Sequence, residues 1–162
     1  MNPCIVLREN DRNRLWGKTM ASYHLVILKK FYLNAILEGR KQIESRFTKT
    51  KRPAFGRVLA GDKLFLKVSS GPVCAGATVK AVTNFENLTP GQIIEIKRRY
   101  NHKIKGSDEY WDSKMNSRFG FLVWLTDVRP IEPVRIRKKD WRTWVILTEK
   151  EDFGLLKTYG LK

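Results

Sequence analysis

The most informative stretch of this sequence is residues 39–46, which read Gly39-Arg40-Lys41-Gln42-Ile43-Glu44-Ser45-Arg46. Residues 30–38 before it have the spacing of a short amphipathic helix, and the residues from Gln42 onwards alternate as in a strand. Gly39 therefore lies where the end of a helix favours a residue that tolerates a positive φ. Alternate side chains of a strand share one face, so Glu44 and Arg46 are predicted to project together.

This cluster of charges has two interpretations. In the first, it is an ion-pair patch on an exposed edge strand, which stabilises a protein by only about 0–1 kcal/mol. In the second, Glu44 and Arg46 line a cleft, and the long side chain of Lys41 reaches the same side from the turn before the strand. The second interpretation makes the stretch a candidate functional site.

The pattern G-x-K-x-x-E-x-R after a short helix resembles the signature of the ASCH domain (activating signal cointegrator homology), a branch of the PUA-like superfamily. The four fixed positions are occupied by Gly39, Lys41, Glu44 and Arg46. The resemblance implies an α+β fold, a small and partly open β-barrel with two or three short helices. It extends to a Gly-Asp turn at residues 61–62 and a Ser-Gly-Pro-Val turn that ends at Val73, although Ser70 stands where a smaller residue is typical.

The rest of the chain is dominated by strand patterns. Apolar, branched runs predict strands at residues 23–28, 63–68, 73–85, 118–128, 131–136 and 144–147. Helices are predicted at residues 30–38, 90–100 and 107–115, and the second begins with a capping signal at Thr89, Pro90 and Gln92. Residues 1–20 are polar and lack periodicity, so they are interpreted as an N-terminal extension before a domain at residues 21–162.

Composition restricts the class of partner. The 162 residues suit one domain with a core of its own, and their formal net charge is +16. Such an excess favours a polyanion, because cations that neutralise phosphates release counterions. A membrane surface is the rival partner, but no broad apolar face accompanies the basic residues. Two cysteines and no secretory signal favour a cytoplasmic protein, and no metal-ligand spacing or cofactor-binding loop is present, so no cofactor is predicted.

The charge and the motif together predict binding of single-stranded RNA or a nucleotide. Arg46 offers a planar fork for a phosphate or a base edge, Lys41 a phosphate contact or a general base, and Glu44 a carboxylate that orients both cations or reads an amino group. Bases also stack on exposed aromatic rings. The further candidate contacts are a basic loop and a set of interleaved aromatic and cationic residues: Lys49, Lys51, Arg52, Trp111, Lys114, Arg118 and Trp141.

An enzymatic alternative follows from the resemblance. Some small ASCH-like proteins resemble amidohydrolases that act on N4-acetylcytidine, and others are described as ribonucleases. If the protein is an enzyme, the catalytic candidates are Lys41, Glu44 and a later glutamate, Glu109. By the resemblance, Glu44 stands where those hydrolases have a threonine, and Ser45 is one position off. For RNA cleavage, no second proton-transfer group pairs with Lys41. A protein-interaction adaptor is the third interpretation.

Overall fold

The structure is a computed structural model, and it describes residues 21–158. The predicted N-terminal extension, residues 1–20, lies outside these residues. The described chain forms six strands and four helices in the order β1 (Tyr23–Leu28), α2 (Lys30–Leu37), β2 (Ile43–Thr48), β3 (Lys63–Val68), β4 (Val73–Phe85), α3 (Pro90–Ile104), α4 (Asp108–Lys114), β5 (Phe119–Val134), β6 (Trp144–Ile146) and α5 (Leu155–Thr158).

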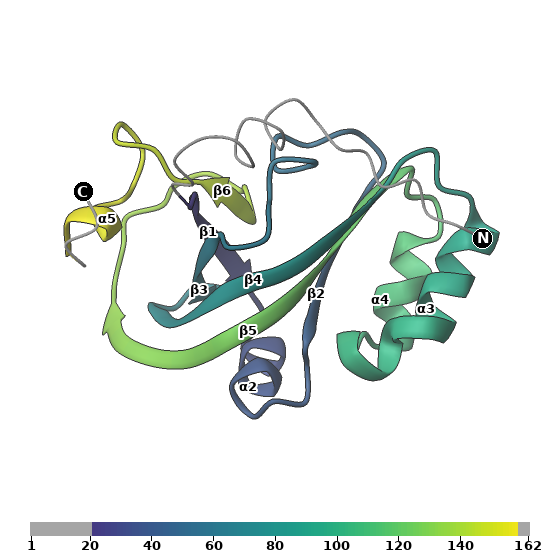
Figure 1. The fold of residues 1–162 in the computed structure, drawn as a ribbon, viewed down its shortest axis with the longest axis horizontal. Helices are drawn as coiled ribbons and strands as arrows, with labels where there is room; N and C mark the ends of the chain where they lie inside the picture. The colour runs from purple at the N-terminus through teal and green to yellow at the C-terminus, as the bar shows by residue number, and fades with distance from the viewer. Residues whose placement is uncertain (1–20, 159–162) are drawn as a thin grey trace.

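All six strands belong to one curled sheet with the order β2-β5-β4-β3-β1-β6 (Figure 1). β1 and β3 pair in parallel, and every other neighbouring pair is antiparallel. The two longest strands, β4 and β5, form the bent centre of the sheet, and their register shifts at three places. The predicted α+β fold with a small, partly open barrel is confirmed, with four helices in the described part rather than two or three.

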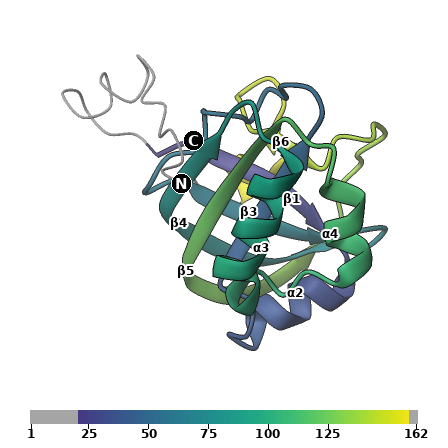
Figure 2. The same ribbon diagram turned by 90° about the vertical axis from the view of Figure 1, so that its right-hand side faces the viewer.

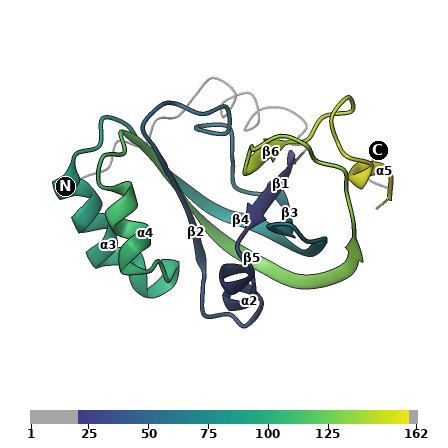
Figure 3. The same cartoon turned by 180° about the vertical axis from the view of Figure 1, so that it is seen from behind.

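The helices lie on different sides of the sheet. α3 and α4 lie side by side over the half of the sheet that contains β2 and β5 (Figures 1 and 2), and their apolar residues share one buried cluster with Ile43, Phe47 and Leu122. α2 covers another side, where Leu33 and Ile36 join the largest cluster. A third cluster joins β1, β3 and β6 to α5, which Figure 3 shows at the opposite end from α3 and α4.

The connection from α2 to β2 forms as the sequence predicts. Gly39 has a φ of +78°, and the backbone N–H groups of Arg40 and Lys41 both donate to the carbonyl of Ala35. The next residue, Gln42, donates its backbone N–H to the carbonyl of Lys103 in α3. The start of β2 is therefore held between two helices, and this fixes the position of the charged residues that follow.

Two predicted element boundaries are wrong. The capping box at Thr89 is confirmed, but α3 continues past Tyr100 to Ile104 and ends where Lys105 adopts a left-handed φ of 63°. The strands predicted at residues 118–128 and 131–136 are one strand, β5, because pairing with β4 continues through a distortion that includes the positive φ of Asp127. Pairing with a partner strand can preserve a strand across residues that locally favour a turn.

Candidate functional site

Lys41, Glu44 and Arg46 converge, as the sequence predicts. The Glu44 carboxylate lies 3.3 Å from the Lys41 ammonium through one oxygen and 3.0 Å from the Arg46 guanidinium through the other. Lys41 and Glu44 are almost fully buried, whereas the Arg46 side chain keeps 18% of its surface exposed. Glu44 therefore lies between two cations, and Arg46 is the member of the three that faces solvent.

Lys41 has its donors directed into the protein. Its Nζ donates to the carbonyl of Ile43 at 2.9 Å and to that of Ile104 at 2.7 Å, in addition to the contact with Glu44. An ammonium group has three N–H donors, so these three acceptors account for all of them. Burial lowers the pKa of Lys41 from its ordinary value, while the adjacent Glu44 carboxylate opposes that shift. Lys41 thus connects β2 to the C-terminal end of α3.

Arg46 crosses the open seam of the sheet, which lies between the edge strands β2 and β6. Its Nη1 donates to the hydroxyl of Thr143, just before β6, at 2.8 Å, and its Nη2 donates to the carbonyl of Ile27 in β1 at 3.1 Å. The guanidinium also lies over the Trp144 ring, 5.4 Å from the ring centre. Its Nε is buried without a hydrogen-bond partner among the described residues.

A cavity of about 580 Å³ opens on one side of Arg46, between β2, α2 and α4. We call it the motif pocket. Four cations and two carboxylates line it, namely Lys29, Lys41, Arg46, Lys114, Glu44 and Glu109. Its volume lies within the range of about 300–1,000 Å³ that is typical of small-molecule sites.

Besides Lys41, two residues of the motif pocket have shifted pKa values. Burial, reinforced by the charge of Arg46, lowers the pKa of Lys114 from its ordinary value. Burial raises the pKa of Tyr110, whose hydroxyl lies 2.6 Å from that of Ser45. The hydroxyl of Tyr110 therefore stays protonated well above neutral pH, so it can act as a hydrogen-bond donor but not as a base.

A second cavity of about 680 Å³ lies on the other side of Arg46, between the basic loop after β2 and the segment before β6. We call it the Trp141 pocket, because the ring of Trp141, at 98% exposure, is the most exposed large apolar side chain that lines it. Its other polar lining residues include Arg52, Arg57 and Arg142. Arg46, Thr48 and Thr143 line both cavities, so the two are neighbours along the seam.

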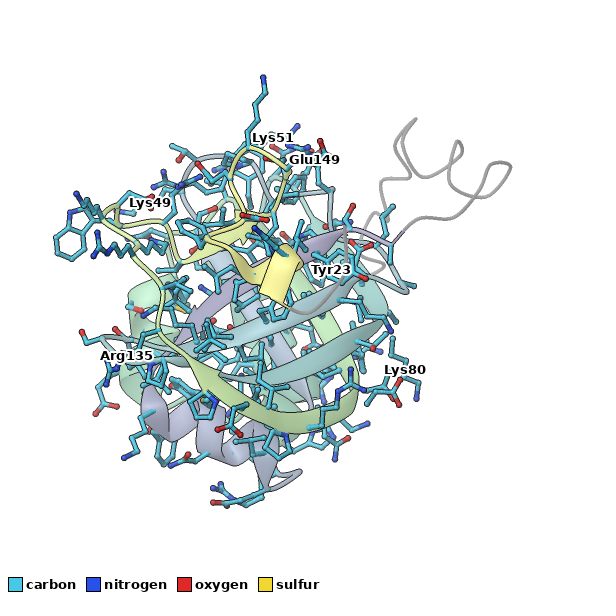
Figure 4. The ribbon with its side chains drawn as sticks, turned by 90° about the vertical axis from the view of Figure 1, so that its left-hand side faces the viewer. Tyr23, Lys49, Lys51, Lys80, Arg135 and Glu149 are labelled. Atoms are coloured by element: carbon cyan, nitrogen blue, oxygen red, sulfur yellow. The ribbon has the colours of Figure 1, made fainter. Side chains whose placement is uncertain are left out.

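The structure separates the predicted contact residues into three groups. Lys41, Glu44, Arg46, Glu109 and Lys114 line the motif pocket, whereas Arg52 and Trp141 line the Trp141 pocket. The third group, Lys49, Lys51 and Arg118, is exposed and lines neither pocket. Figure 4 shows Lys51 extending from the surface at the top of the view and Lys49 nearby.

Trp111 requires a correction. Its ring was expected to be an exposed platform for stacking, but it is 1% exposed and packs beside Phe47, with ring centres 5.7 Å apart. Its indole N–H donates to the side chain of Asn101 at 2.9 Å. Trp111 is therefore a core residue that fixes α4 against α3 and β2.

Sequence reasoning missed several residues of the two pockets. Lys29, the hydroxyl pair of Ser45 and Tyr110, and Thr143 were not predicted as site residues. Lys29 lies between β1 and α2, two residues after Ile27, whose carbonyl accepts a hydrogen bond from Arg46. Its position in this connection is the signal that could have identified it. Thr143 offered no such signal, because it reaches the site only through the pairing of β6 with β1.

Two kinds of feature are not found within residues 21–158. No group of three or more His, Cys, Asp or Glu side chains there is arranged to hold a metal ion. Within the same residues, no helix has the length and apolar character needed to cross a membrane.

Comparison with known proteins identifies the fold. No protein-family model matches the sequence, and no curated protein matches it. The crystal structure of ASCH from Zymomonas mobilis superposes with a TM-score of 0.62 at 16% identity, over 83% of this chain and 94% of that one. Two mutants of the same protein give TM-scores of 0.62 and 0.64 at 16% and 15% identity, over 84% and 86% of this chain and 95% and 97% of theirs.

The chain therefore has the fold of this ASCH protein, as its resemblance to the ASCH domain predicts. Identity at this level defines the fold and not the activity. The chemistry of the site depends on the residues of this chain.

Proposed function

We propose that the motif pocket binds the phosphate and base of single-stranded RNA or of a nucleotide. The observation that supports this most directly is the convergence of Lys29, Arg46 and Lys114 on one cavity. Their mutual influence is visible in Lys114, whose pKa is lowered by burial, by Arg46 and by Lys29, with Glu44 opposing. A bound phosphate would relieve the repulsion among these cations, and it is an acceptor that a guanidinium matches well.

The residues of the pocket divide into a frame and a contact surface. Lys41 and Glu44 form the frame, because their charged groups are buried and bonded to each other and, for Lys41, to the backbone. Arg46 and Lys114 form the contact surface, since each keeps part of its side chain accessible. The sequence-based role of Lys41 as a phosphate ligand is thus replaced in this proposal by a positioning role.

The exposed basic residues would extend the anion path beyond the pocket. Lys49, Lys51 and Arg118 are exposed, and the contact of Lys51 with the Glu86 carboxylate is a long one of 3.8 Å. Contacts of this kind add affinity without reading sequence, because they neutralise backbone phosphates. The net charge of +16 is consistent with a polyanionic ligand longer than one nucleotide.

A hydrolase, either a ribonuclease or an N4-acetylcytidine amidohydrolase, has less support from the geometry. General base catalysis needs a group that can accept a proton at the reaction pH. Lys41 has its donors committed to three acceptors, and burial raises the pKa of Tyr110. Glu109 lines the pocket but is exposed. Binding without catalysis accounts for the site and requires no general base.

The experiment that tests the proposal is the salt dependence of binding to a labelled single-stranded RNA. Each phosphate contact of a single strand contributes about −0.7 to the slope of log K against log salt. We expect Lys114→Ala to weaken binding and to reduce the slope by about that amount. Lys80→Ala is the matched control, because Lys80 is exposed, lines neither pocket, and lies on the far side of the view from Lys49 in Figure 4.

Two outcomes would contradict the proposal. Binding that is absent, or that has the same slope in both variants and the unmodified protein, would exclude phosphate recognition by the motif pocket. RNA fragments that form in this incubation, or cytidine that forms from added N4-acetylcytidine, and that disappear with Lys41→Ala, would show that the protein is a hydrolase.

A further inference from the structure

We propose that the Trp141 pocket binds the base of a second, adjacent nucleotide, so that the ligand is a strand of at least two nucleotides that crosses the sheet seam at Arg46. The inference rests on the proposed function of the motif pocket and specifies its substrate class. It assigns a role to a cavity that residues 39–46 reach only through Arg46.

The position of the two pockets supports a continuous ligand. Both are lined by Arg46, Thr48 and Thr143, and the guanidinium of Arg46 donates to the hydroxyl of Thr143 at 2.8 Å. The two pockets therefore share Arg46, Thr48 and Thr143 as their boundary. The hydrogen bonds to Thr143 and Ile27 and the ion pair with Glu44 leave one N–H of Arg46 Nη1 uncommitted among the described residues, and this group would donate to the phosphodiester that joins two nucleotides.

The lining of the Trp141 pocket has the chemistry of a base site. Trp141 presents a fully exposed ring on one side, Trp144 lines the pocket as a half-buried ring, and Phe121 and Phe55 line it although both are almost fully buried. Stacking of a base on an aromatic side chain contributes about 1–3 kcal/mol.

The charge of the pocket favours an anion and not an apolar partner. Four arginines line it, Arg46, Arg52, Arg57 and Arg142, and no carboxylate is among its described lining residues. Arg142 is engaged by Asp140 and Glu151, whereas neither Arg52 nor Arg57 forms an ion pair within residues 21–158. Aromatic rings interleaved with arginines are the combination that single-stranded nucleic acid requires.

The segment that carries Trp141 is also held in place. The Asp140 carboxylate accepts hydrogen bonds from Lys138 at 2.9 Å and from the Arg142 guanidinium at 2.8 Å, and Arg142 reaches Glu151 at 2.7 Å. These bonds on both sides of Trp141 restrict its backbone. A restricted aromatic residue loses less conformational entropy on binding than a mobile one.

The test compares the affinities of adenosine 5′-monophosphate and the 5′-phosphorylated dinucleotide pApA. One extra stacked base predicts that the unmodified protein binds pApA between about fivefold and a hundredfold more tightly. Trp141→Ala should abolish this gain and leave the affinity for the monophosphate unchanged, whereas Trp141→Phe should keep most of it. Phe31→Ala is the matched control, because Phe31 is 64% exposed and lines neither pocket.

The possible failures are distinguishable. If the monophosphate binds but the dinucleotide gains nothing, the second site is refuted and the proposed function stands. If neither ligand binds, nor any longer adenosine strand, both proposals fail. A decapeptide of glutamate that binds as tightly as the dinucleotide, with the same sensitivity to Trp141→Ala, would show that the pocket takes an acidic peptide instead.

Discussion

The ammonium group of Lys41 lies within hydrogen-bonding distance of two backbone carbonyls, and its third contact is the Glu44 carboxylate. Strand alternation predicts that Glu44 and Arg46 share a face, and their ion pair of 3.0 Å agrees with this. The contact between Lys41 and Ile104 could not be predicted, because it depends on where a helix 63 residues later ends. The local sequence pattern thus indicates which side chains converge. Which acceptors pair with their hydrogen-bond donors depends on the tertiary fold.

We expect Lys41→Met to reduce the free energy of unfolding by about 3 kcal/mol, at the lower end of the range for a buried pair that loses one partner. The lower end applies because Glu44 keeps its contact with Arg46. Urea denaturation measures the change, with Lys80→Met as the exposed control. A loss of less than about 0.5 kcal/mol, typical of a surface substitution, would mean that Lys41 does not support the fold.

The raised pKa of Tyr110 should make the stability of the protein depend on pH. Its pKa is raised from an ordinary value of 10.0 by burial, so above pH 10 the unfolded chain loses this proton while the folded protein keeps it. The free energy of unfolding should therefore fall as the pH rises above 10, by up to about 1.4 kcal/mol per pH unit from this group. Tyr110→Phe should remove that component; equal slopes for the two proteins in alkaline urea titrations would contradict the assignment.

At the scale of the elements, Trp111 and Trp141 were both predicted to be exposed, but only Trp141 is. The short length of α4, which carries Trp111, is the reason. Trp111 and Trp141 both have charged sequence neighbours, and this suggested exposure for both. α4 has only seven residues, too few for a periodic pattern to show which side faces the sheet. The patterns of α2 and of the strands other than β5 are clearer, and these elements were predicted correctly to within a few residues.

Substitution of the two tryptophans should have opposite consequences. Trp111→Ala should cost about 3–5 kcal/mol, as removal of a buried large side chain does, whereas Trp141→Ala should change stability by less than about 0.5 kcal/mol. Thermal unfolding of both variants provides the comparison. A similar loss for both would contradict the burial of one ring and the exposure of the other.

For the whole molecule, the open seam of the barrel is the feature that places the site. Sequence patterns predicted a partly open barrel, but not that β2 and β6 form its edges, since strand order depends on pairings between distant segments. Arg46 joins these edges through Thr143 and Ile27, and the two pockets lie on either side of it. The proposed function thus gives Arg46 a binding role in addition to its structural one.

Arg46→Gln should loosen the seam locally. Hydrogen bonds to charged groups contribute about 1.5–3 kcal/mol, so the amides of β6 should exchange with solvent at least tenfold faster in the variant. Hydrogen exchange followed by mass spectrometry detects this, and the β3–β4 pairing serves as the internal reference. Unchanged exchange in β6 would show that Arg46 does not hold the edges together.

The most direct test of the motif pocket is a crystal structure of the protein with adenosine 5′-monophosphate. The phosphate should lie within about 3.2 Å of a nitrogen of Arg46 and of the Lys114 ammonium, with Lys41 still bonded to Glu44 and the two carbonyls. A phosphate bound outside the pocket, or one that displaces Lys41 from these partners, would contradict the account.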